Sequence, residues 1–586
     1  MVKSTKLIDK VENMFWHEAD FVIVGGGTSG CMAAIRLKEI LPRANVVIVE
    51  KANIVRSGCL AAGLNAINAY IHDGETPESF VRYVRFDAMG LIREDLVLTM
   101  AARLNEGVKR MESYGLPIAY DNSGKYLRRG RWGLVIFGEK LKPILSKKCE
   151  ELGVSVLNRI NVTGLLVHES HIAGVVGFDV RNGDIHVIRT PAVIVATGGA
   201  AGLYRPNNPS GAHHTMWYCP FNVGTGYAIG LRVGAEMTSF EMRFVALRTK
   251  DVIAPTGTLA LLFKAPIVNS RNEHFMRENW GHFGGDAAPT CIRAYAVVKE
   301  LKEGRGPCFF DLRHVSKEQL DELYAAYLDM FPSAALAWAS EGFDPQVDTI
   351  EVCTTEPYIV GGHCQSGYWI DERRKTTVDG LYACGDVAGG APFKFISGAW
   401  AEALIAAESA VQDEKGNPAI SIETIKASDG FVKEIERLTA PFKCSLPAHL
   451  AITPKELELR LQKIMDEYAG GISTFYETNE ALLKCALKHL KTLREQSQWL
   501  VAKTPHELML AHEVLDRIEV AEVVVAHLLF RRETRWACFQ TRTDYPNRDD
   551  INWLLFVNSR RDVESGELRV FTRPYRQIVS GDRYLP

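Results

Sequence analysis

The sequence has neither a long apolar run nor a marked excess of charge of one sign. No uninterrupted apolar stretch approaches the ~18 residues of a membrane span, and the segment EVAEVVVAHLLF near Val520 carries Glu and His. A formal net charge of -3 lacks the basic excess of nucleic-acid binders. The N-terminal stretch MVKSTKLIDKVENMFWHEAD is polar and mixed in charge, unlike a signal peptide. We therefore expect a cytoplasmic protein that binds no nucleic acid and touches a membrane, if at all, only through a complex.

The cysteines lack the spacing of a metal site. The sequence has 12 of them, scattered and without a CxxC pair, including Cys31, Cys59, Cys149, Cys384 and Cys538. Zinc and iron–sulfur sites need clustered Cys or His ligands. We expect no metal site on this chain, and we expect most of its cysteines to be reduced, buried and inert.

The sequence does contain a strand, a glycine-rich turn and a helix in succession. DFVIVGGG reads as a buried strand entering a turn, TSGCMAAIRLKEIL as the next helix, and NVVIVEK as a second buried strand. Gly25, Gly27 and Gly30 stand in the GxGxxG register, which permits a tight turn, close approach of a pyrophosphate and close helix packing. Glu50 ends the second strand at the spacing that accepts ribose hydroxyls, which favours FAD or NAD over NADP.

Two later segments favour FAD over NAD. ATGGA, residues 196–200, and GLYACGDVAGG, with Asp386, resemble the returning segments of flavoproteins with two dinucleotide-binding domains, in which Asp386 would bind the ribityl chain. Earlier in the chain, HIAGVVGFDV and GDIHVIR together show the alternation of a hairpin. The expected fold class is α/β, with a two-dinucleotide-binding-domain-type FAD-binding Rossmann domain, an inserted α+β capping domain and a C-terminal helical domain.

Changes of pattern along the 586 residues predict several domains. Loops and helices are mixed in the middle of the chain, helical periodicity follows from about Thr453, and the last segments read as strands. Strands of one sheet bracket the middle region, which indicates an insertion. The expected divisions are 1–243 and 349–440 for the two parts of the FAD-binding domain, 244–348 for the capping domain, 441–535 for the helical domain and 536–586 for an extended tail.

The segment after Glu50, EKANIVRSGCLAAGLNAINAYI, is crowded with Gly and Ala. Small side chains let a ligand approach the backbone. The segment resembles the isoalloxazine-contacting loop of the fumarate reductase/succinate dehydrogenase flavoprotein superfamily. There the residue after Arg-Ser is often a histidine joined to FAD, whereas this chain has Gly58, so the resemblance implies non-covalent FAD. The expected cofactor-binding residues are Gly25, Gly27, Gly30, Glu50, Lys51, Ser57, Gly58, Ala196, Thr197, Gly198, Gly385, Asp386 and Ser397.

Further blocks in order along almost the whole chain resemble the branch of dissimilatory adenylylsulfate reductase α subunits. They include GRWGLVIFGEKLKPIL, TCIRAYAVVKELKEGRGP and RRETRWACFQTRTDYPNRDD. The resemblance implies two-electron reduction of adenylylsulfate to sulfite and AMP through a sulfite adduct at flavin N5. It also implies a set of residues around the substrate. Those expected in catalysis are Arg293, Arg248, His363, Asn68 and Glu139, and those expected to bind the substrate are Trp217 and Leu261.

The residue types in this set suit a doubly anionic substrate. Arginines can neutralise phosphate and sulfate oxyanions and the charge on the departing AMP, while Trp and Leu offer apolar surfaces. The chain has no cluster motif and no NAD site of its own, so the resemblance implies that an iron–sulfur (β-type, [4Fe–4S]) subunit donates the electrons. The tail beyond Trp536 is either a docking surface for that subunit or a cover over its own domain.

Two other functions remain open at this level. Arg293 also falls where fumarate reductases place a proton-donating arginine, but the dicarboxylate-binding segments of that branch are replaced by RFVALR, EPYIVGG and PFKFISG. A non-catalytic electron-transfer flavoprotein is the third alternative, although buried arginines without a ligand would be costly. Phe221 stands where the adenylylsulfate reductase pattern has a tryptophan, which leaves open a related anionic substrate.

Overall fold

The centre of the molecule is a five-stranded parallel sheet built from segments far apart in the sequence. The computed structural model describes residues 13–208, 216–250, 263–413, 420–444, 446–447 and 449–581. The strand order is β18–β11–β2–β3–β7, and all four neighbouring pairs are parallel. The strands are β2 (Phe21–Val24), β3 (Val46–Glu50), β7 (Ser155–Asn158), β11 (Val193–Val195) and β18 (Leu381–Ala383). The prediction that later segments complete this sheet is confirmed.

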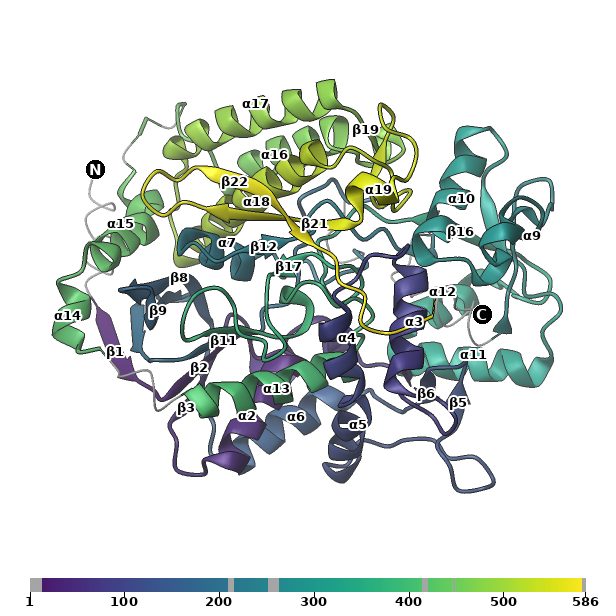
Figure 1. Cartoon of the computed structure of the whole chain (residues 1–586), viewed down its shortest axis with the longest axis horizontal. Coiled ribbons are helices and arrows are strands. Elements are labelled where there is room, and N and C mark those ends of the chain that lie inside the picture. Colours follow the sequence, from purple (N-terminus) through teal and green to yellow (C-terminus); the bar gives the residue numbers. More distant parts are fainter. Residues whose placement is uncertain are drawn as a thin grey trace.

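Alternate side chains of the sheet pack into two cores. Phe21 and Ile23 join the core beneath the sheet, while Val22 and Val24 join the core above it. The helices on the lower face are α2 (Thr28–Ile40), α5 (Leu104–Ser113), α6 (Leu141–Glu151) and α13 (Ser397–Asp413). Figure 1 shows α2, α6 and α13 side by side under the strands. Because both faces are buried, the strands other than the edge strand β7 are nearly continuous apolar runs rather than alternating ones.

A second sheet confirms the predicted hairpin. Its order is β1–β10–β9–β8, with β9 antiparallel to β10 and β1 parallel to β10. The strands are β1 (Met14–Glu18), β8 (Ile160–His168), β9 (His171–Asp179) and β10 (Ile185–Arg189). The outer face packs on Ile425 and Phe431, which lie on α14 (Ile422–Lys426) and α15 (Asp429–Lys443).

The inserted segment has its own sheet and core. The order is β13–β16–β15–β14, and every pair is antiparallel. The strands are β13 (Leu247–Thr249), β14 (Ile267–Val268), β15 (Cys308–Phe310) and β16 (Ile350–Thr354). The helices are α9 (Phe275–Trp280), α10 (Thr290–Lys302), α11 (Lys317–Met330) and α12 (Pro332–Glu341). Since β16 pairs with β13 and β15, this sheet extends beyond the boundary that we expected at Asp348.

A three-stranded sheet lies where the FAD-binding region meets the inserted segment. Its order is β4–β6–β5, with strands β4 (Ala66–Ile67), β5 (Arg128–Arg129) and β6 (Gly133–Val135). The loop leading to β4 packs against the last turn of α11, since a Cβ at Gly63 would lie 3.0 Å from the carbonyl oxygen of Asp329. The first half of the FAD-binding region therefore touches the inserted segment here.

The predicted helical region forms long capped helices. They are α16 (Pro454–Tyr468), α17 (Glu480–Gln496) and α18 (Pro505–Phe530), and they lie together along the top of Figure 1. Thr453 and Glu456 form a capping box, and Thr504 caps α18 ahead of Pro505. Leu461, Leu490 and Val524 are fully buried and belong to one core. The apolar stripe seen in the sequence therefore packs between the helices.

The strands predicted in the extended C-terminal tail are present and form a hairpin that is paired with the rest of the molecule. β21 (Leu555–Arg561) pairs with β22 (Leu568–Pro574) and with β12 (Met237–Thr238), which pairs in turn with β17 (Gly367–Tyr368). The backbone amides of Ile578 and Val579 each donate to Glu94 at 2.8 Å. Glu94 lies on α4 (Glu94–Ala101), beside α3 (Pro77–Asp87). Of the two alternatives for the tail, these contacts favour a cover over its own domain.

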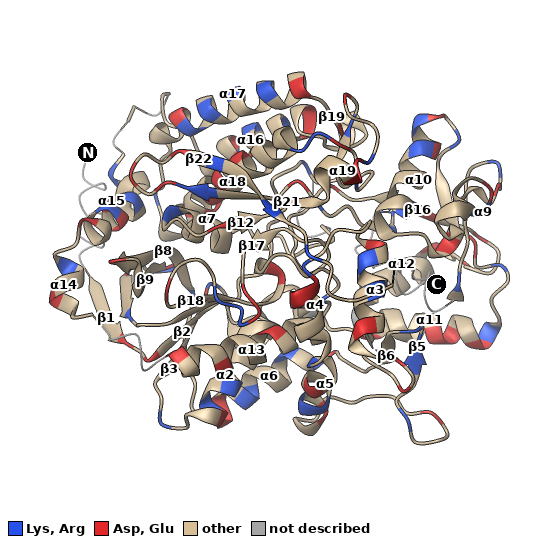
Figure 2. Cartoon of the chain, viewed as in Figure 1, with Lys and Arg blue, Asp and Glu red and all other residues tan. Residues whose placement is uncertain are grey.

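Charged residues are distributed over the outer helices with both signs mixed, as Figure 2 shows for α16 and α17. Within the described ranges, no helix has the length and apolar character to cross a membrane. All 12 cysteines are free. Seven of them are buried, as expected, whereas Cys59 and Cys485 are exposed. The remaining helices and strands are α7 (Thr225–Arg232), α19 (Asp550–Trp553), β19 (Glu477–Thr478) and β20 (Thr541–Arg542).

Candidate active site

The turn between β2 and α2 forms a backbone cradle. Gly25 has a φ of 100°, and a Cβ added there would lie 2.7 Å from the carbonyl oxygen of Ala196. A Cβ at Gly30 would lie 1.9 Å from the carbonyl oxygen of Gly25. Gly27 precedes α2 without any side-chain cap, and the first turn has no acidic residue. The first N–H groups of α2 are thus available to a phosphate group, which is what a pyrophosphate at this turn requires.

Glu50 closes one side of the cradle. Its carboxylate accepts hydrogen bonds from the backbone amides of Gly26 and Ala52, each at 2.7 Å. The side chain is 7% exposed and stands at the carboxyl end of β3. Lys51, by contrast, turns away from the cradle, because its Nζ donates at 2.6 Å to both Glu513 and the Phe221 carbonyl. Its bond to Glu513 joins the cradle region to α18.

The small-residue segment after Glu50 lies directly against the turn. The Ser57 hydroxyl donates to the Gly26 carbonyl at 3.2 Å. Gly58 has a φ of 81°, a backbone conformation that other residues rarely adopt, and a Cβ there would lie 3.4 Å from Gly27 Cα. The short helices η1 (Ile54–Arg56) and η2 (Cys59–Ala62) flank it. The structure thus places the predicted flavin-contacting loop beside the cradle.

The returning segments meet at the same edge of the sheet. Ala196, Thr197 and Gly198 follow β11, and Gly385 and Asp386 begin η7 (Gly385–Val387) after β18. Tyr218 links them, since its hydroxyl donates to Asp386 at 2.8 Å and accepts from the Gly199 amide at 2.8 Å. Burial raises the pKa of Asp386. Ser397 begins α13, and its hydroxyl donates to the Ala69 carbonyl.

Two residues that support this edge were not predicted. Tyr218 stands beside the predicted Trp217, so the matched block contained the signal. Lys394 is fully buried, and its Nζ donates to the carbonyls of Gly385 at 2.8 Å and Ala388 at 2.5 Å and pairs with Glu402 at 3.2 Å. It therefore fixes the loop that carries Asp386. A single lysine in a glycine-rich region gives no sequence signal for that contact.

An aromatic group surrounds His363. Its ring stacks on Phe244 with centroids 4.5 Å apart, and Trp217 meets it edge-on at 5.1 Å. Phe395 approaches it at 5.5 Å. Burial lowers the pKa of His363 to about 4. The imidazole is therefore neutral near pH 7 and offers hydrogen bonds rather than positive charge.

The two predicted arginines lie on the inserted segment. Arg248, on β13, is fully buried, and its guanidinium donates to the Asn207 carbonyl. Arg293, on α10, donates to the Thr290 hydroxyl at 3.2 Å, while its buried Nε has no hydrogen-bond partner. Asp87 on α3 is the acid next to it, and burial raises the pKa of Asp87 to about 6 although Arg293 opposes the shift. Arg293 thus keeps donor capacity for an anion.

The remaining predicted residues are Asn68, Glu139 and Leu261. Asn68 follows β4, and its Oδ1 lies 3.5 Å from the Cβ position of Gly133. Glu139 pairs with Arg56 at 3.1 Å, and both side chains are about half exposed (49% and 47%), which places Glu139 at the rim. Leu261 lies outside the described residues.

Two cysteines stand beside the cradle. The Cys59 thiol lies 3.6 Å from Asn222 Nδ2, which also contacts the Tyr218 hydroxyl. A hydrogen bond with Cys59 lowers the pKa of Cys219 to about 7, with further help from backbone amides and Lys51. The expectation that most cysteines are inert does not suit Cys219, whose lowered pKa favours a thiolate near neutral pH, whereas burial of its thiol raises the pKa of Cys59.

Comparison with known families agrees with this geometry. Residues 20–394 match a family described as FAD binding domain, and residues 458–579 match one described as fumarate reductase flavoprotein C-term. The α subunit of adenylylsulfate reductase from Megalodesulfovibrio gigas is 33% identical over 97% of this chain and 96% of its own. L-aspartate oxidase from Streptomyces coelicolor is 26% identical over 92% of this chain and 91% of its own.

Solved structures give the same result. Adenylylsulfate reductase from Archaeoglobus fulgidus matches with a TM-score of 0.91 and 36% identity, covering 98% of each chain. A structure of adenosine-5-phosphosulfate reductase in complex with sulfite as a covalent adduct matches with a TM-score of 0.91 and 37% identity, also over 98% of each. E. coli quinol fumarate reductase, at a TM-score of 0.82 and 20% identity, shares the fold.

Proposed function

The chain belongs to the FAD-binding fumarate reductase/succinate dehydrogenase flavoprotein family, and from this premise we propose that it is the flavoprotein α subunit of an adenylylsulfate reductase. It is an FAD-dependent oxidoreductase that acts on a sulfur group. The reaction proposed is reduction of adenylylsulfate by two electrons to sulfite and AMP.

One observation carries the proposal. The relatives that match this chain from end to end at 33–37% identity are adenylylsulfate reductases, and one of their structures holds sulfite. The fumarate reductase structure matches at only 20%, which speaks to the fold alone. The neutral His363 among aromatic rings also offers no charge to a second carboxylate. Fumarate reduction is therefore the weaker candidate.

The FAD cradle fits its cofactor by its own contacts. Gly25, Gly27 and Gly30 leave room for the pyrophosphate at the start of α2, and Glu50 stands where ribose hydroxyls would be bound. Asp386, held by Tyr218, would bind the ribityl chain. When bound, FAD supplies the electron pair that the reduction requires.

The chain's own residues bind and orient the substrate. Arg293, with its unpartnered Nε, and Arg248 would hold the phosphate and sulfate oxyanions. The same guanidinium groups stabilise the negative charge that grows on the AMP phosphate as it leaves. Trp217 offers an apolar surface, and His363 donates a hydrogen bond without adding charge. Asn68 completes the polar side of the site.

Electrons must reach this site from another protein. No group of three Cys, His, Asp or Glu residues that could hold a metal occurs in the described part of the chain. We propose that an iron–sulfur subunit of the β type, with [4Fe–4S] clusters, is the donor in a cytoplasmic complex. The α-subunit designation of the M. gigas relative supports a multi-subunit assembly.

The test uses the holoprotein reduced anaerobically with dithionite and then desalted anaerobically, because dithionite is itself oxidised to sulfite. Addition of adenylylsulfate should reoxidise the flavin and release sulfite and AMP in equal amounts, measured by absorbance and by chromatography. Addition of fumarate to a parallel sample should leave the flavin reduced. Reoxidation by fumarate with no response to adenylylsulfate would replace the proposal with the fumarate reductase alternative.

A further inference from the structure

The buried arginines of this protein differ in how their charge is compensated. Ten arginines are buried in the described residues: Arg85, Arg129, Arg243, Arg248, Arg374, Arg517, Arg531, Arg535, Arg542 and Arg561. Seven pair with a carboxylate: Arg85, Arg374, Arg517, Arg531, Arg535, Arg542 and Arg561. Arg243 instead donates to the carbonyls of Phe539, Ala469 and Gly470 and to the Tyr204 hydroxyl. In eight of these ten arginines the positive charge is therefore compensated by a carboxylate or by several carbonyl groups, even where a single Nε lacks a hydrogen bond, as in Arg374 and Arg561.

Arg129 departs from this pattern. Its side chain is nearly enclosed, with 6% of the residue exposed, and it makes one hydrogen bond, from Nη1 to Asn65 Oδ1 at 3.0 Å. Its Nε is buried without a partner. No acidic side chain pairs with it anywhere in the described ranges. Burial lowers the pKa of Arg129 to about 10, so the group is still charged near pH 7.

A buried charge of this kind needs an anion. Taking a guanidinium out of water is unfavourable, and a single bond to a neutral amide recovers little of the loss. Arg128, next in the strand, points to the opposite face and is exposed, as alternation requires. The burial of Arg129 is thus specific to its position and not a property of the segment.

Arg129 lies in the same small sheet as the segment that leads to Asn68. β5 and β4 both pair with β6, and Asn68 follows β4 directly. A Cβ at Gly133 would lie 2.6 Å from the backbone carbonyl of Arg129 and 3.5 Å from Asn68 Oδ1, so the Arg129 backbone and the Asn68 side chain flank the same glycine. Asn65, the partner of Arg129, belongs to the small-residue segment that follows Gly58.

The inserted segment also comes close to Arg129. Tyr327 on α11 is fully buried and close enough for the Arg129 charge to lower its pKa, while burial raises it. Tyr327 also faces Thr249, the residue after Arg248 on β13. Arg129 therefore lies at the seam between the FAD-binding half and the segment that carries Arg248.

We propose that Arg129 is a further anion-binding residue of the substrate site, in which its free N–H groups hold an oxyanion of a phosphate or sulfate ester. A guanidinium presents a planar fork that matches such oxygens with two hydrogen bonds. Asn65 holds one arm of the fork and leaves the remaining N–H groups for the ligand. The identity of the ester rests on the proposed function. The contact between Arg129 and an anion does not depend on that function.

The experiment compares Arg129→Gln with Arg128→Gln, a matched control on the exposed face of the same strand. Binding of AMP and of sulfite to the FAD-loaded protein is followed by calorimetry and by the flavin spectrum. Arg129→Gln should keep its FAD and weaken AMP or sulfite binding at least tenfold, with KM for adenylylsulfate rising more than kcat falls. Arg128→Gln should change both affinities less than twofold.

Unchanged affinity for both ligands in Arg129→Gln would overturn the inference and leave Arg129 a structural residue. If wild-type protein does not turn over adenylylsulfate, yet its sulfite binding depends on Arg129, the proposed function fails while the anion contact stands. Where Arg129→Gln does not fold, Arg129→Lys supplies the comparison, because it keeps the charge but loses the fork. Intermediate affinity in that variant supports the contact, and wild-type affinity overturns it.

Discussion

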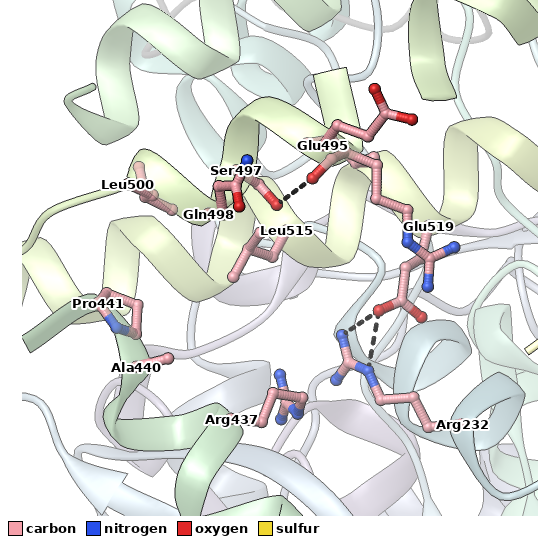
Figure 3. Close-up of a pocket in the computed structure, with 12 residues that line it drawn as sticks. Arg232, Arg437, Ala440, Pro441, Glu495, Ser497, Gln498, Leu500, Leu515 and Glu519 are labelled. Carbon is pink, nitrogen blue, oxygen red and sulfur yellow. Dashed lines mark hydrogen bonds and ion pairs between the residues drawn. The ribbon is translucent and has the colours of Figure 1, made fainter. Parts of the chain in front are cut away.

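Two regions of this protein gather arginines, and only one of them has the properties of an anion site. A cavity of about 460 Å³ lies between the helices around α15, α17 and α18, and Figure 3 shows arginine side chains on its wall. Arg232 pairs there with Glu519 at 2.9 Å, Arg437 with Glu434 at 2.7 Å, and Arg494 with Glu522 at 3.1 Å. Each positive charge already has its carboxylate.

The seam between the FAD-binding half and the inserted segment is different. Arg129 has no acidic partner in the described ranges, and the Nε of Arg293 is buried without a hydrogen bond. An anion entering the helical cavity would have to displace a carboxylate, whereas an anion at the seam would supply a missing one. Uncompensated charge, rather than the number of arginines, separates a binding site from a structural ion network.

The largest expected effect is on stability in the helical cavity. Arg232→Ala leaves Asp516, which is nearly fully buried, without its guanidinium partner, and breaking a buried pair in this way costs about 3–5 kcal/mol. We expect a lower denaturant midpoint with unchanged KM for adenylylsulfate. Arg494→Ala, which removes a side chain that is about half exposed, should cost less than about 1 kcal/mol. A selective rise in KM in Arg232→Ala would erase the contrast between the two regions.

At the seam the effect should fall on catalysis. Arg293→Ala removes a donor to the oxyanions, and loss of one such donor typically lowers kcat about 10²–10³-fold. The variant should keep its FAD and lose little stability, because Arg293 makes one hydrogen bond, to Thr290, and the buried Asp87 beside it can take up a proton. Steady-state kinetics and the flavin content of the purified protein are the measurements. Loss of flavin would instead assign Arg293 a structural part.

A smaller effect concerns Asp87 and pH. Burial raises its pKa to about 6, so the folded state favours the neutral acid. The stability from this shift is fully present below the unfolded pKa, near pH 4, and is lost as pH rises through 6. Above pH 6 the carboxylate also competes with the substrate for Arg293. KM should therefore rise with pH across this range in wild type but not in Asp87→Asn, and parallel pH profiles would exclude the competition.

The smallest effect is local to the cradle. Because the pKa of Cys219 is lowered to about 7, iodoacetamide should modify it with a rate midpoint near that pH in protein stripped of FAD. Bound FAD should slow the reaction several-fold, as peptide mass spectrometry can show. Cys485, which is exposed and lies on α17, serves as the reference thiol. If bound FAD slows the modification of Cys219 and Cys485 equally, Cys219 does not lie at the cofactor site.

Much of the fold and part of the site could be predicted from local sequence. The apolar run of β2, the spacing of Gly25, Gly27 and Gly30, and Glu50 at the end of β3 act within one βαβ unit, where backbone sterics and hydrophobic burial decide the outcome. The family could likewise be predicted from the sequence, because the matched blocks occur in the same order along the chain. Positions such as Trp217 and His363 came with those blocks, and the structure brings their rings together.

The remaining features depend on contacts between distant segments. Strand β21 pairs with β12, and β16 pairs with β13. These pairings depend on which unpaired strand edges meet in the folded protein, and the sequence of a strand does not identify its partner. Likewise the letters Arg-Arg at 128–129 do not reveal that only Arg129 is buried, or that no carboxylate comes to meet it. The sequence by itself determined the cofactor cradle and the lineage, because glycine geometry and strand period are local. Only the tertiary structure decided which arginines are left uncompensated, because the compensation of a charge depends on every segment that packs around it.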